Sequence, residues 1–95
     1  MSYKRQYHLM EWLSDERRTA LGPDNLLLLR NAFVQFSTAF DETIKTRANG
    51  LPLDYVVSKL YSRFGIPGEP ELSYSSETLA YYDCMWRIVV SALDW

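Results

Sequence analysis

Cysteine and histidine are almost absent from this 95-residue sequence, which contains only Cys84 and His8. One cysteine cannot form an internal disulfide, so we expect a reducing, cytoplasmic location and a small buried thiol. His8 and Glu11 have the three-residue spacing of a metal-binding pair, but no second such pair exists. We therefore expect no metal, no cofactor and no histidine-based catalytic site.

Long apolar runs and phosphate-binding glycine motifs are also missing. No stretch of 18 apolar residues occurs, and the first residues lead into charged side chains, so we expect neither a membrane span nor a signal peptide. Residues 65–68 lack the Gly-Lys-Ser/Thr of a phosphate loop. The adjacent carboxylates Asp15 and Glu16 diverge by about 100° on a helix and do not converge on a substrate. These absences predict a protein that is not an enzyme.

Basic residues are outnumbered slightly by acidic ones, ten against twelve, giving a formal net charge of -2. This balance weakens attraction to phosphates, so we expect no nucleic acid among the partners. One alternative stays open. Helices expected near 23–44 and 52–64 could form a helix-turn-helix unit, whose second helix would offer residues such as Lys59 and Arg63 to DNA.

Aromatic residues are abundant, at 15% of the chain, within an apolar fraction of 47%. The length and apolar fraction predict one folded domain spanning residues 1–95, with one core. Because a core of this size does not obviously need so many aromatic rings, we expect some of them to contact a partner.

Apolar residues recur every three or four positions, which predicts an all-α fold, a compact bundle of about four helices. The expected helices are 3–21, 23–44, 52–64 and 75–95. The turn that closes the second helix is expected at Ala48-Asn49-Gly50. One long loop rich in Pro and Gly precedes the last helix, whose N-cap is expected at Ser75 or Ser76. We expect seven side chains to be buried together: Leu29, Phe33, Phe36, Phe40, Leu60, Trp86 and Val89.

The last expected helix is apolar nearly all round. One stripe contains Leu79, Tyr82, Trp86, Val89, Val90 and Leu93, and a second contains Tyr81, Cys84, Met85, Ile88, Ala92 and Trp95. Such a helix is either central, with the other helices around it, or shared with another chain. In the second case the side bearing Tyr81, Ile88 and Trp95 docks a partner or a second copy of the protein.

Trp12 falls outside the apolar face of the first expected helix and lies nearest Arg5, His8, Asp15 and Glu16. A tryptophan surrounded by charges is typical of a protein interface, although Trp12 could instead cover the end of the long loop. Three further residues are candidates for partner binding. Tyr55 and Lys59 lie off the expected apolar face of the third helix, and Tyr74 lies in the long loop.

These patterns together favour a small non-enzymatic protein-binding module. We expect an inhibitor or adaptor that occupies a surface of a larger host enzyme complex. A phage or another mobile element is the kind of source that we expect for such a protein. The alternatives are a DNA-binding transcriptional regulator that uses the second and third helices, and a homodimeric structural subunit.

Overall fold

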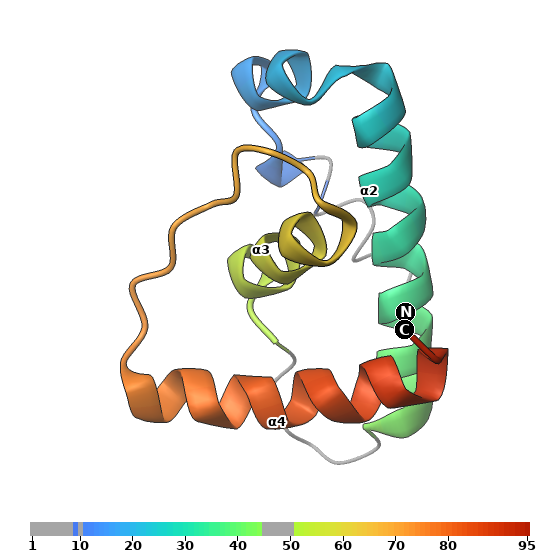
Figure 1. Cartoon of the computed structure of the whole chain (residues 1–95), viewed down its shortest axis with the longest axis vertical. Coiled ribbons are helices and arrows are strands. Elements are labelled where there is room, and N and C mark those ends of the chain that lie inside the picture. Colours follow the sequence, from blue (N-terminus) through green and yellow to red (C-terminus); the bar gives the residue numbers. More distant parts are fainter. Residues whose placement is uncertain (1–8, 10, 45–50) are drawn as a thin grey trace.

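The computed structural model describes residue 9, residues 11–44 and residues 51–95 (Figure 1). Within these ranges the chain forms three α-helices and no strand: α2 (Asp15–Thr43), α3 (Leu53–Phe64) and α4 (Ser76–Leu93). The all-helical class is therefore confirmed, whereas the four-helix bundle is not. No helix in the described part of the chain combines the length and apolar content of a membrane span.

The expected helix 3–21 is interrupted before α2 begins. Leu13 and Ser14 are not helical, and the Ser14 side chain accepts a hydrogen bond from the backbone N–H of Arg17. Ser14 thus satisfies one of the free N–H groups at the start of α2, and Asp15 and Glu16 follow in its first turn. The expectation of one continuous helix was wrong because Ser14 acts as an N-cap.

Gly22 bends α2 where the sequence predicts a helix boundary. Its φ of 77° and ψ of 165° are not helical, and Pro23 follows directly. Glycine adopts positive φ without steric cost, and proline is tolerated at the first position of the helical segment after it. The backbone therefore changes direction at Gly22, although Asp15–Thr43 forms one element. The helix end expected at residues 48–50 lies outside the described residues.

α3 is the most enclosed helix. Pro52 precedes it and Gly65, with a φ of 67°, ends it. Figure 1 shows α3 (yellow) with α2 on one side, α4 below and residues 65–75 around the rest. Half of its residues are buried: Tyr55, Val56, Val57, Ser58, Leu60 and Tyr61.

The core forms where α2 packs against α3 and α4. Six of the seven predicted core residues are buried: Leu29, Phe33, Phe36, Phe40, Leu60 and Val89. The seventh, Trp86, is partly buried and stacks on Phe36 with ring centroids 4.9 Å apart. The predicted helical stripes therefore identify the core, with Trp86 at its edge.

α4 lies on the outside of the molecule. Its N-cap is Ser75, one of the two serines that the sequence suggests, and the Ser75 side chain accepts from the Thr78 N–H. Figure 1 shows α4 (orange to red) crossing the lower part of α2. Only Met85 and Val89 of its residues are buried. The interpretation of the last helix as the central one is therefore wrong, because α3 has the more enclosed position.

Candidate functional site

One side of α4 presents apolar side chains to solvent. Tyr81 is 55% exposed and Ile88 is 48% exposed, and Cys84 and Ala92 are exposed between and beyond them. Their spacing of three, four and four residues aligns all four on one side of the helix, here called the α4 face. The expectation that Cys84 is buried is wrong, because this side of α4 has no neighbouring helix in the described structure.

The opposite side of α4 is fixed to α3 by a polar contact. The Tyr55 hydroxyl donates a hydrogen bond to Asp83 Oδ1, and Lys59 Nζ lies 3.2 Å from the same oxygen. The Tyr55 hydrogen bond, with help from Lys59, holds the pKa of Asp83 below its usual value. Burial, together with the bond to Asp83, raises the pKa of Tyr55. This network keeps α4 in place while its other side faces solvent.

Tyr55 was predicted to bind a partner, and the structure overturns that prediction. Its side chain is fully buried, and its ring packs edge-on against Tyr82 with centroids 5.3 Å apart. Lys59 lies beside it, half-buried in the ion pair with Asp83. The helical wheel placed Tyr55 off the apolar face, but α4 covers that side of α3 as well.

Tyr74 links the segment before α4 to the start of α3. Its hydroxyl donates to Asp54 Oδ1 at 2.7 Å, and its ring packs edge-on against Tyr82 at 5.4 Å. The hydrogen bond to Asp54, together with burial, raises the pKa of Tyr74 to about 12. The predicted partner-binding residue Tyr74 therefore has an internal role, with only part of its surface open.

Trp95 does not extend the α4 face. Asp94 adopts a left-handed conformation with a φ of 60°, and the Trp95 N–H then donates to the Val90 carbonyl at 3.1 Å. The Trp95 ring packs edge-on against Phe64 at 5.3 Å and lies 6.4 Å from Trp86. Of the predicted docking residues on α4, Tyr81 and Ile88 are thus brought together, and Trp95 packs against the core instead.

Trp12 lies near the start of α2, half-buried against the core. The guanidinium carbon of Arg17 lies 4.9 Å from the centroid of the Trp12 ring. Asp15 and Glu16 are exposed nearby in the first turn of α2. The other two predicted neighbours of Trp12, Arg5 and His8, lie outside the described residues. Sequence reasoning missed Arg17 because it assumed an unbroken helix through Ser14.

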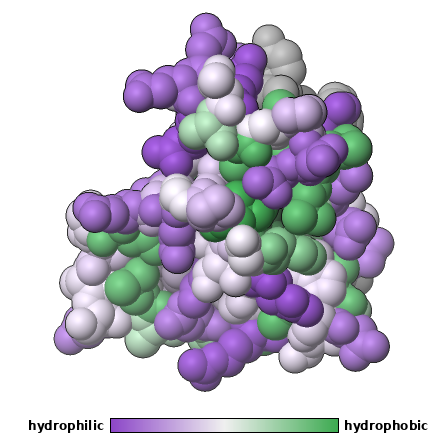
Figure 2. All heavy atoms as spheres, turned by 45° about the horizontal axis from the view of Figure 1, so that its top comes forward, coloured by the Kyte–Doolittle hydropathy of each residue, from purple (hydrophilic) through white to green (hydrophobic). Residues whose placement is uncertain are grey.

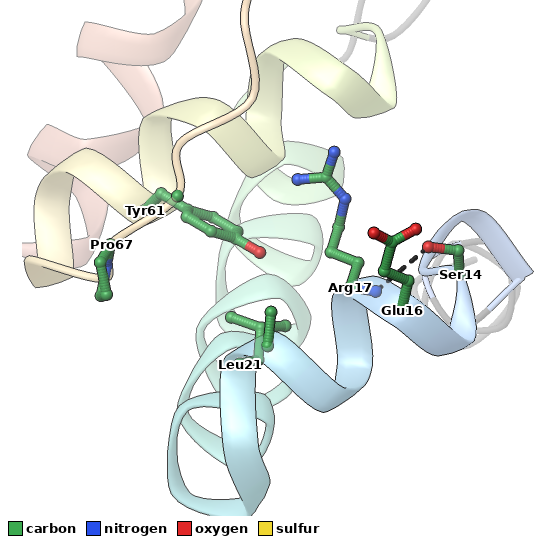
Figure 3. Close-up of a pocket in the computed structure, with 8 residues that line it drawn as sticks. Ser14, Glu16, Arg17, Leu21, Tyr61 and Pro67 are labelled. Carbon is green, nitrogen blue, oxygen red and sulfur yellow. Dashed lines mark hydrogen bonds between the residues drawn. The ribbon is translucent and has the colours of Figure 1, made fainter.

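A pocket of about 330 Å3 lies between the first turns of α2, Tyr61 of α3 and the segment after α3 (Figure 3). Its lining residues are Ser14, Glu16, Arg17, Ala20, Leu21, Tyr61, Pro67 and Gly68. Tyr61 is only 1% exposed, yet Figure 3 shows its hydroxyl directed toward the α2 side of the pocket. No sequence signal marks this pocket, because its walls come from three separate segments.

Charged and apolar side chains share the surface. Figure 2 shows hydrophilic side chains projecting along the upper part of one face, with hydrophobic atoms toward its middle. Within the described ranges, no three His, Cys, Asp or Glu side chains gather in a way that could hold a metal ion. No protein family model, curated protein or solved structure matches this chain.

Proposed function

We propose that this protein is a non-enzymatic binding module, an inhibitor or adaptor, that docks the α4 face onto a larger protein. One observation carries the proposal: Tyr81, Cys84, Ile88 and Ala92 form a continuous apolar stripe whose two large members are about half exposed. A continuous exposed apolar stripe on a small folded domain is typical of a protein interaction site.

The stripe has the chemistry of a helix that binds in a groove of its partner. Such helices present apolar anchors at intervals of three, four and seven residues. Tyr81 and Ile88 are seven residues apart and supply the large anchors, while Cys84 and Ala92 are small and allow close approach of the partner backbone. Because α4 is already folded, binding does not require ordering of the helix.

The polar side chains between α3 and α4 support a structural role rather than catalysis. Tyr55 bonds Asp83, and Tyr74 bonds Asp54, so these hydroxyl and carboxylate groups are occupied by one another. A catalytic acid or base must instead reach a substrate proton. These residues are better suited to holding α4 than to reacting.

The DNA-binding alternative is less well supported by the geometry. Ser58, at the centre of the expected recognition helix, is 3% exposed and donates a hydrogen bond to Glu69 Oε1 at 2.8 Å. Lys59 is ion-paired with Asp83. A recognition helix must present a whole side to the major groove, and α3 has half of its residues buried.

Site-specific crosslinking from the α4 face tests the proposal. A photoreactive amino acid at position 88 should crosslink one protein in cells, and the same group at Leu27 should not, although Leu27 is 56% exposed. With that protein purified, Ile88→Glu should weaken binding about 30-fold, equivalent to about 2 kcal/mol. Leu27→Glu is the matched control and should bind normally. Equal loss in the two variants would contradict a specific role for α4.

A homodimer is the second candidate, and the small residues on both sides of Ile88 on the α4 face would let two copies of α4 approach closely. Cys84 and Ala92 lie four residues on either side of Ile88. In an antiparallel pair of α4 helices with the two-fold axis at Ile88, the two isoleucines meet, and each Cys84 faces Ala92 of the other copy. A two-fold interface requires such a self-complementary surface.

A second cysteine tests the homodimer and its register together. In Ala92→Cys, Cys84 of one copy would face the new thiol of the other, and a disulfide can form if close packing of the two helices brings the Cα atoms to about 4.4–6.8 Å. Oxidation should then give a covalent dimer, whereas the wild type with Cys84 alone should stay uncrosslinked. Light scattering that shows a monomer at high concentration would exclude the homodimer.

A further inference from the structure

We propose that the pocket beside Tyr61 binds a carboxylate group carried on a short aliphatic segment, from either a small molecule or a glutamate side chain of a polypeptide. This inference does not depend on the α4 face, which is a separate surface. Three features of the pocket support it: a tyrosine hydroxyl directed into it, an adjacent guanidinium group and an apolar wall.

The Tyr61 hydroxyl is the first feature. The side chain is 1% exposed, and none of the described residues forms a hydrogen bond with its hydroxyl. The other buried tyrosine of α3, Tyr55, bonds Asp83. Among the described residues, the Tyr61 oxygen is not one of the side-chain atoms that are both shielded from solvent and without a partner, so it is open to the pocket. A hydroxyl that no neighbouring residue uses and that is directed into an open pocket can donate a hydrogen bond to a ligand.

Arg17 supplies a positive charge on the same pocket. Its guanidinium carbon lies 4.9 Å from the centroid of the Trp12 ring, a cation–π contact that restricts the side chain. Figure 3 shows the guanidinium on the same side of the pocket as the Tyr61 hydroxyl. The planar guanidinium donates two parallel hydrogen bonds to a carboxylate, and the Tyr61 O–H can donate a third.

The remaining walls limit what the carboxylate can be attached to. Ala20, Leu21 and Pro67 give the pocket an apolar lining, which suits methylene groups. A volume of about 330 Å3 is at the small end of ligand sites, enough for a few carbon atoms and a carboxylate. Glu16 also lines the pocket, and its negative charge opposes that of the ligand. Removal of this charge should therefore strengthen binding.

A titration with butyrate and its neutral amide tests the chemistry. Amide shifts in the 1H–15N spectrum of the full chain should change for residues 14–21 and for Gly68 with butyrate, and binding of butyramide should be at least tenfold weaker. Two capped tripeptides, Ala-Glu-Ala and Ala-Gln-Ala, form the second arm. Binding by the glutamate peptide alone would assign a polypeptide source, and binding by butyrate would assign a small molecule; either result supports a carboxylate site.

Four substitutions assign the binding to the proposed groups. Tyr61→Phe and Arg17→Gln should each lower affinity about tenfold or more, and Glu16→Gln should raise it several-fold. Arg87→Gln removes an exposed arginine of α4 and is the control, with unchanged affinity. Circular dichroism confirms folding of each variant. The proposal would be overturned if the acid and its amide bound equally well, or if neither butyrate nor the Ala-Glu-Ala peptide bound. Unchanged affinity in Tyr61→Phe and Arg17→Gln would also overturn it.

Discussion

α4 is more apolar than α3, yet a smaller share of its residues is buried. Most side chains of α4 are apolar, yet only two of its 18 residues are buried. α3 contains two tyrosines and a serine among its buried residues, and six of its 12 residues are buried. The comparison shows that the burial of a helix depends on how many of its sides other segments cover. It does not follow from the apolar content of the helix.

The two helices also handle polar groups differently. Inside the fold, the hydroxyls of Tyr55 and Ser58 are paired with the carboxylates of Asp83 and Glu69. These bonds compensate for the loss of water around groups that would otherwise be costly to bury. On its outer side α4 has the apolar side chains of Tyr81 and Ile88, which are about half exposed. α3 therefore uses its sequence for stability, whereas α4 leaves part of its apolar surface open, as the proposed docking role requires.

Among substitutions that only remove atoms, truncation of a core leucine in α3 should have the largest effect. Leu60 has no exposed surface, so Leu60→Ala should lower the free energy of unfolding by about 2–5 kcal/mol. Ile88→Ala on α4 is the control and should cost less than about 1 kcal/mol, since Ile88 is 48% exposed. Urea denaturation measures both values, and similar losses would contradict the contrast between the two helices.

Loss of the bond between the helices should have the next largest effect. Tyr55→Phe keeps the buried ring and removes the hydroxyl that donates to Asp83, so it should destabilise the protein by about 1–2 kcal/mol. Tyr81→Phe removes the hydroxyl of a tyrosine that is 55% exposed and should change stability by less than about 0.5 kcal/mol. Equal values for the two variants would show that the bond to Asp83 contributes nothing.

The sequence predicts which residues are buried better than it predicts how the helices are arranged. The stripe from Leu29 to Phe40 identifies buried residues correctly, because a three- and four-residue spacing is a local property of a helix. Which helix becomes central depends on the path of the whole chain. The spacing of residues within one helix gives no information about that path. Cys84 shows this, since free cysteines are usually buried and the structure leaves this one exposed.

The candidate sites show the same limit. Tyr81 and Ile88 were predicted as partner-binding residues, and the structure places both on one exposed face. Tyr55 was grouped with them and is buried, because α4 covers a side of α3 that looked polar on the helical wheel. The pocket beside Tyr61 could not be predicted, because its walls are far apart in sequence and no motif joins them.

Alkaline pH should weaken the contact between Tyr74 and Asp54. The pKa of Tyr74 is raised from 10.0 to about 12 in the folded protein, so the folded state retains the proton after the unfolded chain has lost it. The stabilisation is complete below pH 10 and is lost as the pH rises to about 12. Tyr74→Phe should therefore lose less stability than the wild type between pH 9 and 12 in urea denaturation.

A matched variant isolates the source of that alkaline loss. Tyr81→Phe also removes one phenol but leaves the Tyr74 hydrogen bond in place, so it should lose stability with pH as the wild type does. Identical pH dependence in Tyr74→Phe and the wild type would show that the bond to Asp54 does not contribute.

Ile88→Glu should have the smallest effect on the isolated protein, and it is the most direct test of the exposed position of α4. A carboxylate introduced into the core would be buried without a partner and would unfold the domain. At position 88, which is 48% exposed, the new side chain can reach water, so the free energy of unfolding should change by less than about 0.5 kcal/mol. Val89→Glu is the matched comparison, since the adjacent Val89 has no exposed surface and the carboxylate should abolish folding. Circular dichroism and urea denaturation measure both. If Ile88→Glu also unfolds the protein, α4 is covered on that side in the folded state, and α3 and α4 do not differ as the structure indicates.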